Sequence, residues 1–103
     1  MKTLILTALS TALLAVSVTA TADQALAQKN ACMSCHGVDK KIVGPSFKDV
    51  AKKYAGDKTA EAKLIAKVKT GGKGVWGEIP MPPNPQVSDA DTKKIVHWVL
   101  HQK

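Results

Sequence analysis

The stretch Cys32-Met33-Ser34-Cys35-His36 decides how this chain folds. C-x-x-C-H is the attachment signature of a c-type haem. If the segment is helical, Cys32 and Cys35 lie at positions i and i+3 on one face, where two thiols can add to the two vinyl groups along one haem edge. His36 shares that face, and histidine is a common axial ligand of haem iron. The motif therefore predicts one covalently attached haem c, with His36 bound to its iron.

The cysteine pair has two other interpretations. C-x-x-C is also typical of a thiol oxidoreductase, which needs a βαβ context, and the chain after the motif has no βαβ pattern. A structural zinc site needs four nitrogen or sulfur ligands, and beyond the motif the sequence offers only His97 and His101. Haem explains the motif best, and a thiol oxidoreductase using Cys32 and Cys35 is kept as an alternative function.

The N-terminal segment, residues 1–22, has the composition of a secretory signal peptide. Lys2 supplies a positive charge, residues 4–18 are apolar or small without any charge, and residues 20–22 form an A-x-A cleavage site. An uncleaved membrane anchor is the alternative, but the apolar run is short for a span, which needs about 20 residues. A second A-x-A at residues 25–27 would remove most of the helix expected to carry the motif. We therefore predict export and cleavage after residue 22.

Residues 23–103 then form one domain without an internal repeat. A core this small is marginal by itself and usually needs reinforcement. The domain's aromatic residues are few, namely Phe47, Tyr54, Trp76 and Trp98. A largely apolar haem would supply the missing core. Its attachment uses both thiols, which agrees with a carrier exported to the periplasm.

Four helical segments around one long irregular loop are expected, so the predicted fold is all-α. The first segment spans about residues 23–35 and carries the motif. The second, residues 46–54, and the last, from residue 88, each begin with Ser-x-x-Asp, which is a helix-start signature. The third spans residues 59–70 and stops at two glycines. No window has the alternation of a strand, and we expect about four helices wrapped around one covalently attached haem.

The last predicted helix has one apolar stripe. Ile95, Trp98 and Val99 form the face expected to be buried, while His97 and His101 point more to the outside. The two histidines are one turn apart, so they could hold a metal, or one of them could ligate the haem iron. Their position on the solvent side favours exposed helical histidines.

Residues 71–85 are the second informative segment. The segment begins with glycines and ends with four prolines around Met81. Proline fixes φ, removes a backbone donor, and biases the preceding residue toward an extended conformation. A rigid loop that presents one thioether suits an axial ligand, and methionine opposite histidine raises the reduction potential. Met33 is too near His36 in the chain to reach the other face of the iron, so Met81 is the predicted second ligand.

Four sequence motifs together resemble one family. They are the C-x-x-C-H motif, V-G-P at residues 43–45, G-V-W-G at residues 74–77, and I-P-M-P-P-N at residues 79–84. With them the chain resembles a class I c-type cytochrome, and more narrowly the short bacterial monohaem type that donates electrons to nitrite reductase or terminal oxidases. The resemblance covers essentially all of residues 23–103.

The resemblance implies cofactor-binding roles for four further residues. The Pro45 carbonyl should accept a hydrogen bond from the ring of His36, which would fix the ring and tune the metal. Trp76 should donate its indole N–H to a haem propionate, with simple packing as the alternative. Lys67 should place a cation near a propionate, and Asn84 should lie near the sulfur of the methionine ligand. One departure from the family pattern is an extra residue just after Asn84.

The chain is strongly basic, with a formal net charge of +7. Lysines crowd the region after the motif, at Lys40, Lys41, Lys48, Lys52, Lys53 and Lys58. A basic chain can indicate nucleic-acid binding, but an exported haem protein would rarely meet nucleic acid, and no binding motif is present. The lysines serve either solubility or steering toward acidic redox partners, and the sequence leaves both open.

The sequence therefore predicts a soluble, monomeric, periplasmic electron carrier of respiration, and not an enzyme. Its haem iron would cycle between Fe(II) and Fe(III), with a membrane electron donor on one side and an acidic-surfaced reductase or oxidase on the other. With His36 and Met81 both bound, the iron has no open position for substrate. No stable membrane insertion is expected after signal cleavage. A haem-based gas sensor, which binds gas when Met81 leaves, is the remaining alternative.

Overall fold

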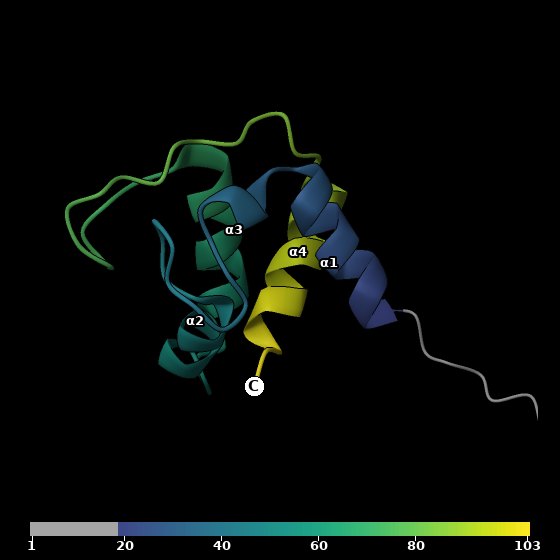
Figure 1. Ribbon diagram of the computed structural model, residues 1–103, viewed down its shortest axis with the longest axis horizontal. Coiled ribbons are helices and arrows are strands. Elements are labelled where there is room, and N and C mark those ends of the chain that lie inside the picture. Colours follow the sequence, from purple (N-terminus) through teal and green to yellow (C-terminus); the bar gives the residue numbers. More distant parts are fainter. Residues whose placement is uncertain (1–18) are drawn as a thin grey trace, which may run out of the picture.

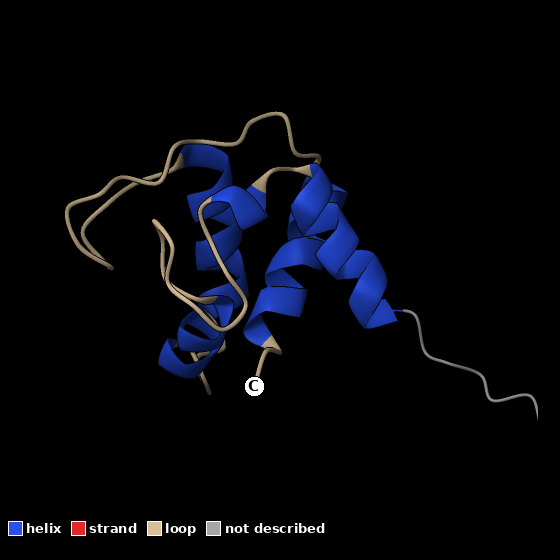
Figure 2. Ribbon diagram, in the orientation of Figure 1, coloured by secondary structure: helices blue, strands red, loops and turns tan. Residues whose placement is uncertain are grey.

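Three helices pack around a fourth in the computed structural model, which describes residues 19–103 (Figure 1). The helices are α1 (Thr19–Lys29), the short 3-10 helix η1 (Cys32–Ser34), α2 (Phe47–Lys53), α3 (Ala60–Thr70) and α4 (Asp89–Leu100). Among residues 19–103 there is no strand, only two isolated bridges (Figure 2). α1, α2 and α3 each contact α4. The predicted all-α fold is confirmed.

The helix is interrupted between α1 and η1. The prediction of one helix over about residues 23–35 is therefore wrong. Asn30 bonds back to the Leu26 carbonyl through both its backbone N–H, at 3.1 Å, and its side-chain amide, at 2.9 Å. Ala31 then adopts a left-handed conformation with φ 62°. The chain resumes as η1, in which side chains at i and i+3 eclipse one another. Cys32 and Cys35 therefore still share one side, as the attachment motif requires.

α1 also begins earlier than expected, at Thr19 rather than near residue 23. Cleavage after residue 22 would remove its first turn. Most of the predicted signal peptide, residues 1–18, lies outside the described residues. None of the helices in the described part of the chain is long and apolar enough to cross a membrane.

Both predicted serine caps start helices as expected. The Ser46 hydroxyl accepts from the Asp49 N–H at 3.1 Å and starts α2. The Ser88 hydroxyl accepts from the Asp91 N–H at 3.1 Å and starts α4. Each serine satisfies one backbone donor that the first helical turn leaves without an internal partner, which is typically worth about 1 kcal/mol. The Ser-x-x-Asp prediction is confirmed at both sites.

The core lies where α2 meets α4. Phe47 and Val50 of α2 pack with Ile95, Trp98 and Val99 of α4, and all five are buried. The Phe47 and Trp98 rings meet edge to face, with centroids 5.3 Å apart, a geometry that aromatic pairs favour. The buried stripe predicted for the last helix is confirmed. Because the stripe also reaches the cavity described below, α4 supports both the fold and the site.

Lys69 near the end of α3 ties that helix to the start of α4. Its ammonium donates to the Val87 carbonyl and lies 2.9 Å from a carboxylate oxygen of Asp89. The hydrogen bond and charge of Lys69 lower the pKa of Asp89 below its usual range. The carboxylate is fully exposed, so the pair contributes little energy. It does fix the chain between the long loop and α4.

Candidate functional site

A cavity of about 390 Å³ lies between the helices and the loops that follow the C-x-x-C-H motif and α3. Its walls come from η1, α2, α3, α4 and two loops, residues 35–45 and 72–82. Most of the lining is apolar, including Val50, Leu64, Val68, Ile95 and Val99. The volume and lining are typical of a site for a small apolar ligand or cofactor. Cys32, Cys35, His36 and Met81 all line it.

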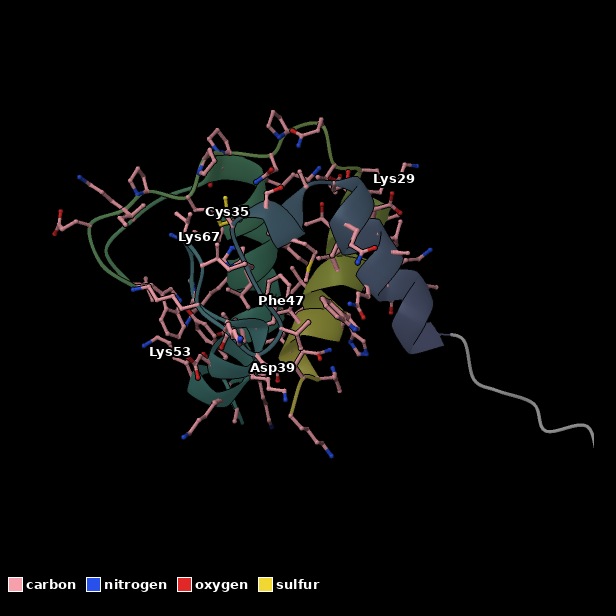
Figure 3. All side chains as sticks on the ribbon, viewed as in Figure 1. Lys29, Cys35, Asp39, Phe47, Lys53 and Lys67 are labelled. Carbon is pink, nitrogen blue, oxygen red and sulfur yellow. The ribbon has the colours of Figure 1, made fainter. Side chains whose placement is uncertain are left out.

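The two thiols stand at one wall of the cavity, where both are half-buried. Figure 3 shows Cys35 and Lys67, which both line the cavity, on the same side of the molecule. Burial raises the pKa of the Cys32 thiol, and the neighbouring Cys35 adds to the rise against an opposing backbone hydrogen bond. Redox-active C-x-x-C pairs depend instead on a lowered thiol pKa. The environment of Cys32 therefore does not favour thiol oxidoreductase chemistry.

The imidazole of His36 is restrained on three sides. Its Nδ1 lies 2.8 Å from the Pro45 carbonyl, and since a carbonyl only accepts, Nδ1 carries the proton and Nε2 presents a lone pair. The ring stacks on Phe47, with centroids 5.1 Å apart and planes 23° apart. Gly44 approaches so closely that a Cβ there would lie 2.4 Å from the His36 Cε1. These contacts hold the His36 ring in one tautomer and one orientation, which a metal ligand requires.

The loop around Gly44 is held by the motif itself. The Cys35 carbonyl accepts hydrogen bonds from the Gly44 N–H at 2.8 Å and the Val43 N–H at 3.1 Å. The loop therefore returns directly to the cysteine that precedes His36. This local return explains how Pro45, nine residues after His36 in the chain, reaches its ring. The hydrogen bond between His36 and Pro45 is the one that the family resemblance implies.

Met81 is fixed by its backbone. It exchanges two hydrogen bonds with Gly72, at 2.8 and 3.0 Å, in an antiparallel bridge. At the neighbouring Gly71, whose φ is +73°, a Cβ would lie 2.5 Å from the Met81 carbonyl oxygen. The Asn84 N–H donates to the Val68 carbonyl of α3 at 2.9 Å. The base of the loop is therefore closed on the end of α3, and the half-buried Met81 side chain lines the cavity.

The other predicted site residues lie in different surroundings. Lys67 lines the cavity from α3, and Trp76 lines it from the loop while 44% of its surface stays exposed. The Lys53 ammonium stands 5.4 Å from the centroid of the Trp76 ring. Asn84 is not among the residues that line the cavity, and its side-chain amide donates to the Pro82 carbonyl at 3.1 Å. The structure thus brings Lys67 and Trp76 to the cavity but leaves Asn84 outside it.

His97 and His101 do not line the cavity. Both are exposed on α4 and just beyond it, as the amphipathic pattern predicts. Neither is therefore placed to ligate an iron held in the cavity.

The donor set of the cavity fits haem c. Two thiols of a C-x-x-C-H motif can form thioethers, and the imidazole and thioether side chains are common axial ligands of haem iron. The walls between them are apolar, as a porphyrin requires. Gly44 supplies a further match, since only a residue without a Cβ leaves room for the His36 ring in this orientation.

The cytochrome c family model matches residues 21–103 of the chain. The protein belongs to the cytochrome c family. It is 50% identical to cytochrome c-552 of Nitrosomonas europaea over 103 residues, which cover 100% of both chains. It is 54% identical to cytochrome c-551 of Allochromatium vinosum over 85 residues, 82% of this chain and 90% of that one. The crystal structure of wild-type Nitrosomonas europaea cytochrome c552 matches with a TM-score of 0.75 at 52% identity, covering 78% of this chain and 99% of that one.

The protein is accordingly a small class I c-type cytochrome that carries one covalently attached haem c and transfers electrons. The predicted family, fold, cofactor and electron-transfer function are confirmed. The comparisons give no support to a gas sensor or a thiol oxidoreductase. Sequence reasoning missed two residues that shape the site, Gly44 and Phe47. The V-G-P motif contained the first, but nothing in the sequence indicated that Phe47 stacks on His36.

Proposed function

We propose that this cytochrome attaches its haem through Cys32 and Cys35 and ligates the iron with His36 and Met81, one on each face. The observation that carries the proposal is that all four side chains line one apolar cavity. Backbone hydrogen bonds hold the segments that bear them, with Cys35 bonded to the residue 43–45 loop and Met81 bonded to Gly72.

Bound haem c supplies an iron that alternates between Fe(II) and Fe(III). The protein's own residues hold the ligand geometry constant through that change. Pro45 keeps the His36 Nδ1 proton in place, and Phe47 and Gly44 keep its ring from turning. Apolar walls such as Leu64 and Val68 exclude water. If His36 and Met81 both ligated the iron, no position would be left for a substrate, and the protein would act as an electron carrier and not as an enzyme.

Charged and polar groups at the cavity suit the haem propionates. Lys67 and the Trp76 indole both line the cavity, and we assign them to the propionates. The Lys53 ammonium, 5.4 Å from the centroid of the Trp76 ring, helps to restrain that side chain. Asn84 serves the methionine ligand through the backbone, since its N–H fixes the loop to Val68.

The redox partner is an acidic-surfaced reductase or oxidase, with a membrane electron donor on the other side of the carrier. Two features of the surface support this assignment. Exposed apolar side chains gather at the cavity, namely Val43, Val75, Trp76 and Ile79. Lys41 and Lys73 also line the cavity, and the exposed Lys40 directly precedes Lys41 in the chain. Apolar contact with a cationic surround suits brief, steered encounters. Lys48 is a weaker candidate because it pairs with Asp39.

The signal-peptide pattern supports export, with cleavage after Ala22, and a mature protein that works as a soluble periplasmic monomer of residues 23–103. Nucleic acid is not among the proposed partners, and no stable membrane insertion is proposed after cleavage. Mass spectrometry of the purified exported protein tests the cleavage site and the haem attachment, since both determine its mass.

Optical spectroscopy of the holoprotein tests the proposed ligands. The oxidised protein should show the iron–sulfur charge-transfer band of a methionine ligand, and the reduced protein should not bind carbon monoxide. Loss of that band in Met81→Ala, together with new carbon monoxide binding, identifies the ligand. A wild-type protein without the band, or one that binds carbon monoxide readily, would contradict the role of Met81.

A further inference from the structure

His97 and His101 form a close pair of imidazoles outside the cavity. They lie one turn apart at the C-terminal end of α4, and both are exposed. Their ring centroids are 4.1 Å apart and the ring planes are tilted by 34°. The two side chains are therefore close enough for one imidazole nitrogen of each to approach a common ion. The pair has no part in holding the haem.

A backbone carbonyl orients the His101 ring and selects its tautomer. Its Nδ1 lies 2.7 Å from the His97 carbonyl oxygen, so Nδ1 donates and Nε2 presents its lone pair. Metal-bound histidines almost always donate their other ring N–H in this way, which fixes the tautomer and raises the basicity of the ligand nitrogen. His101 therefore already has the second hydrogen bond of a metal ligand.

We propose that His97 and His101 together bind one divalent transition-metal ion, of the class of Zn²⁺, Ni²⁺ and Cu²⁺. The two imidazoles are the protein ligands and water completes the coordination, because the described residues contain no group of three or more His, Cys, Asp or Glu side chains suited to a metal. The C-terminal end of a helix carries a partial negative charge, which favours a cation there.

The neighbouring charges select the kind of metal. Lys93 and Lys94 precede His97 by one turn and are exposed, and their charges oppose any bound cation. Hard ions such as Mg²⁺ and Ca²⁺, which need carboxylate or carbonyl oxygens, gain nothing here. Only a metal with high affinity for imidazole nitrogen can outweigh that repulsion, and imidazole suits zinc, copper and nickel.

Isothermal titration of the oxidised holoprotein with Zn²⁺ tests the site. Zinc has no redox chemistry, so the haem is undisturbed, and the attached haem leaves no free cysteine to compete. We expect one zinc ion to bind per protein. His97→Gln and His101→Gln should each weaken binding by about 100-fold, since two linked ligands act with a high effective concentration. Lys94→Gln is the matched control and should bind as tightly as wild type or tighter.

A second measurement locates the ion. Substoichiometric Ni²⁺, which is paramagnetic, should broaden the NMR ring signals of His97 and His101 before any others in the wild type. Both histidines are exposed, so the glutamine variants should keep the wild-type haem spectrum, which verifies their fold. Wild-type protein that takes up no zinc would overturn the proposal. Glutamine variants that bind zinc with wild-type affinity would overturn it equally.

Discussion

Replacing Gly44 by alanine tests how the His36 ring is positioned. A Cβ at this position would lie 2.4 Å from Cε1, 2.8 Å from Nδ1 and 3.0 Å from Nε2 of His36. Carbon atoms in ordinary contact are about 3.5–4.0 Å apart, so the ring must move by about 1 Å. Gly44 is not among the glycines with positive φ, so alanine suits its backbone. The perturbation therefore acts through the ring alone.

Three terms set the size of the effect. Overpacking a filled site costs about 1–3 kcal/mol, and losing the hydrogen bond from His36 Nδ1 to Pro45 costs about 1 kcal/mol more. Removing a glycine stabilises the folded state by about 0.4–1 kcal/mol through the unfolded chain. The steric term wins, and we expect Gly44→Ala to lose about 1–3 kcal/mol. For a domain of this size that corresponds to a fall in Tm of about 5–20 °C.

The assay combines thermal unfolding with two reports on the haem. Thermal unfolding of the oxidised protein gives Tm, while the reduction potential and the hyperfine-shifted NMR signals report the orientation of His36. Gly56→Ala is the control, because its Cβ would meet nothing within 4 Å but its φ is +77°. That variant should lose about 1–2 kcal/mol through backbone strain and keep the wild-type haem signals. Gly44→Ala with wild-type Tm, potential and NMR signals would refute the steric account.

Four further predictions follow from the site and the surface. Haem should remain on the wild-type chain through acid–organic extraction, and Cys35→Ala should lose one thioether and compromise maturation, as mass spectrometry would reveal. Met81→His should lower the reduction potential by on the order of 0.1 V, since axial ligation spans about 0.8 V across haem proteins; an unchanged potential in redox titration would exclude Met81 as ligand. Electron transfer to an acidic partner should slow steeply with salt, because the Debye length falls from about 30 Å at 0.01 M to about 10 Å at 0.1 M. In stopped-flow kinetics, the double variant Lys40→Gln with Lys41→Gln should show a weaker dependence of the rate on salt. The folded-state pKa of Asp89 is lowered, so its small contribution to the free energy of unfolding is present above the unfolded-state pKa and is lost as the pH falls through the folded-state pKa. In thermal unfolding, Asp89→Asn should therefore lose slightly more stability at pH 7 than at pH 2.

Local signals in the sequence predicted the helix starts and the buried stripe well. Ser46 and Ser88 act within three residues of themselves, so the capping pattern contains the whole interaction. The break at Ala31 was missed because a left-handed alanine has no compositional signature of its own. Asn30 was the available signal, since asparagine often ends helices by bonding back to the last turn. Propensity could not decide between that ending and a continuous helix through the motif.

The candidate site likewise contains residues that a local sequence pattern predicts and residues that it does not. The spacing of Cys32, Cys35 and His36 is a local pattern that the sequence displays completely. Phe47 and Gly44, which meet the His36 ring through space, depend on how the loop between them folds. Only a family resemblance could supply a contact of that kind, as it did for Pro45. Spacing along the chain fixes which atoms react with haem, and loop geometry fixes how firmly they are held.

The methionine loop shows the limit of an argument from composition. The prolines predicted a rigid loop, yet the structure fixes the loop mainly at its base, where Gly72 pairs with Met81 and Val68 accepts from Asn84. Beyond that base, residues 73–80 are all exposed, and Val75, Trp76 and Ile79 among them line the cavity. The same loop therefore contains a backbone-paired segment that holds Met81, the proposed ligand, and an exposed segment available to a partner. The backbone pairing of Gly72 with Met81 holds Met81 independently of residues 73–80. A partner that docks on residues 73–80 therefore need not disturb the geometry of Met81, and the reduction potential can stay constant while partners differ.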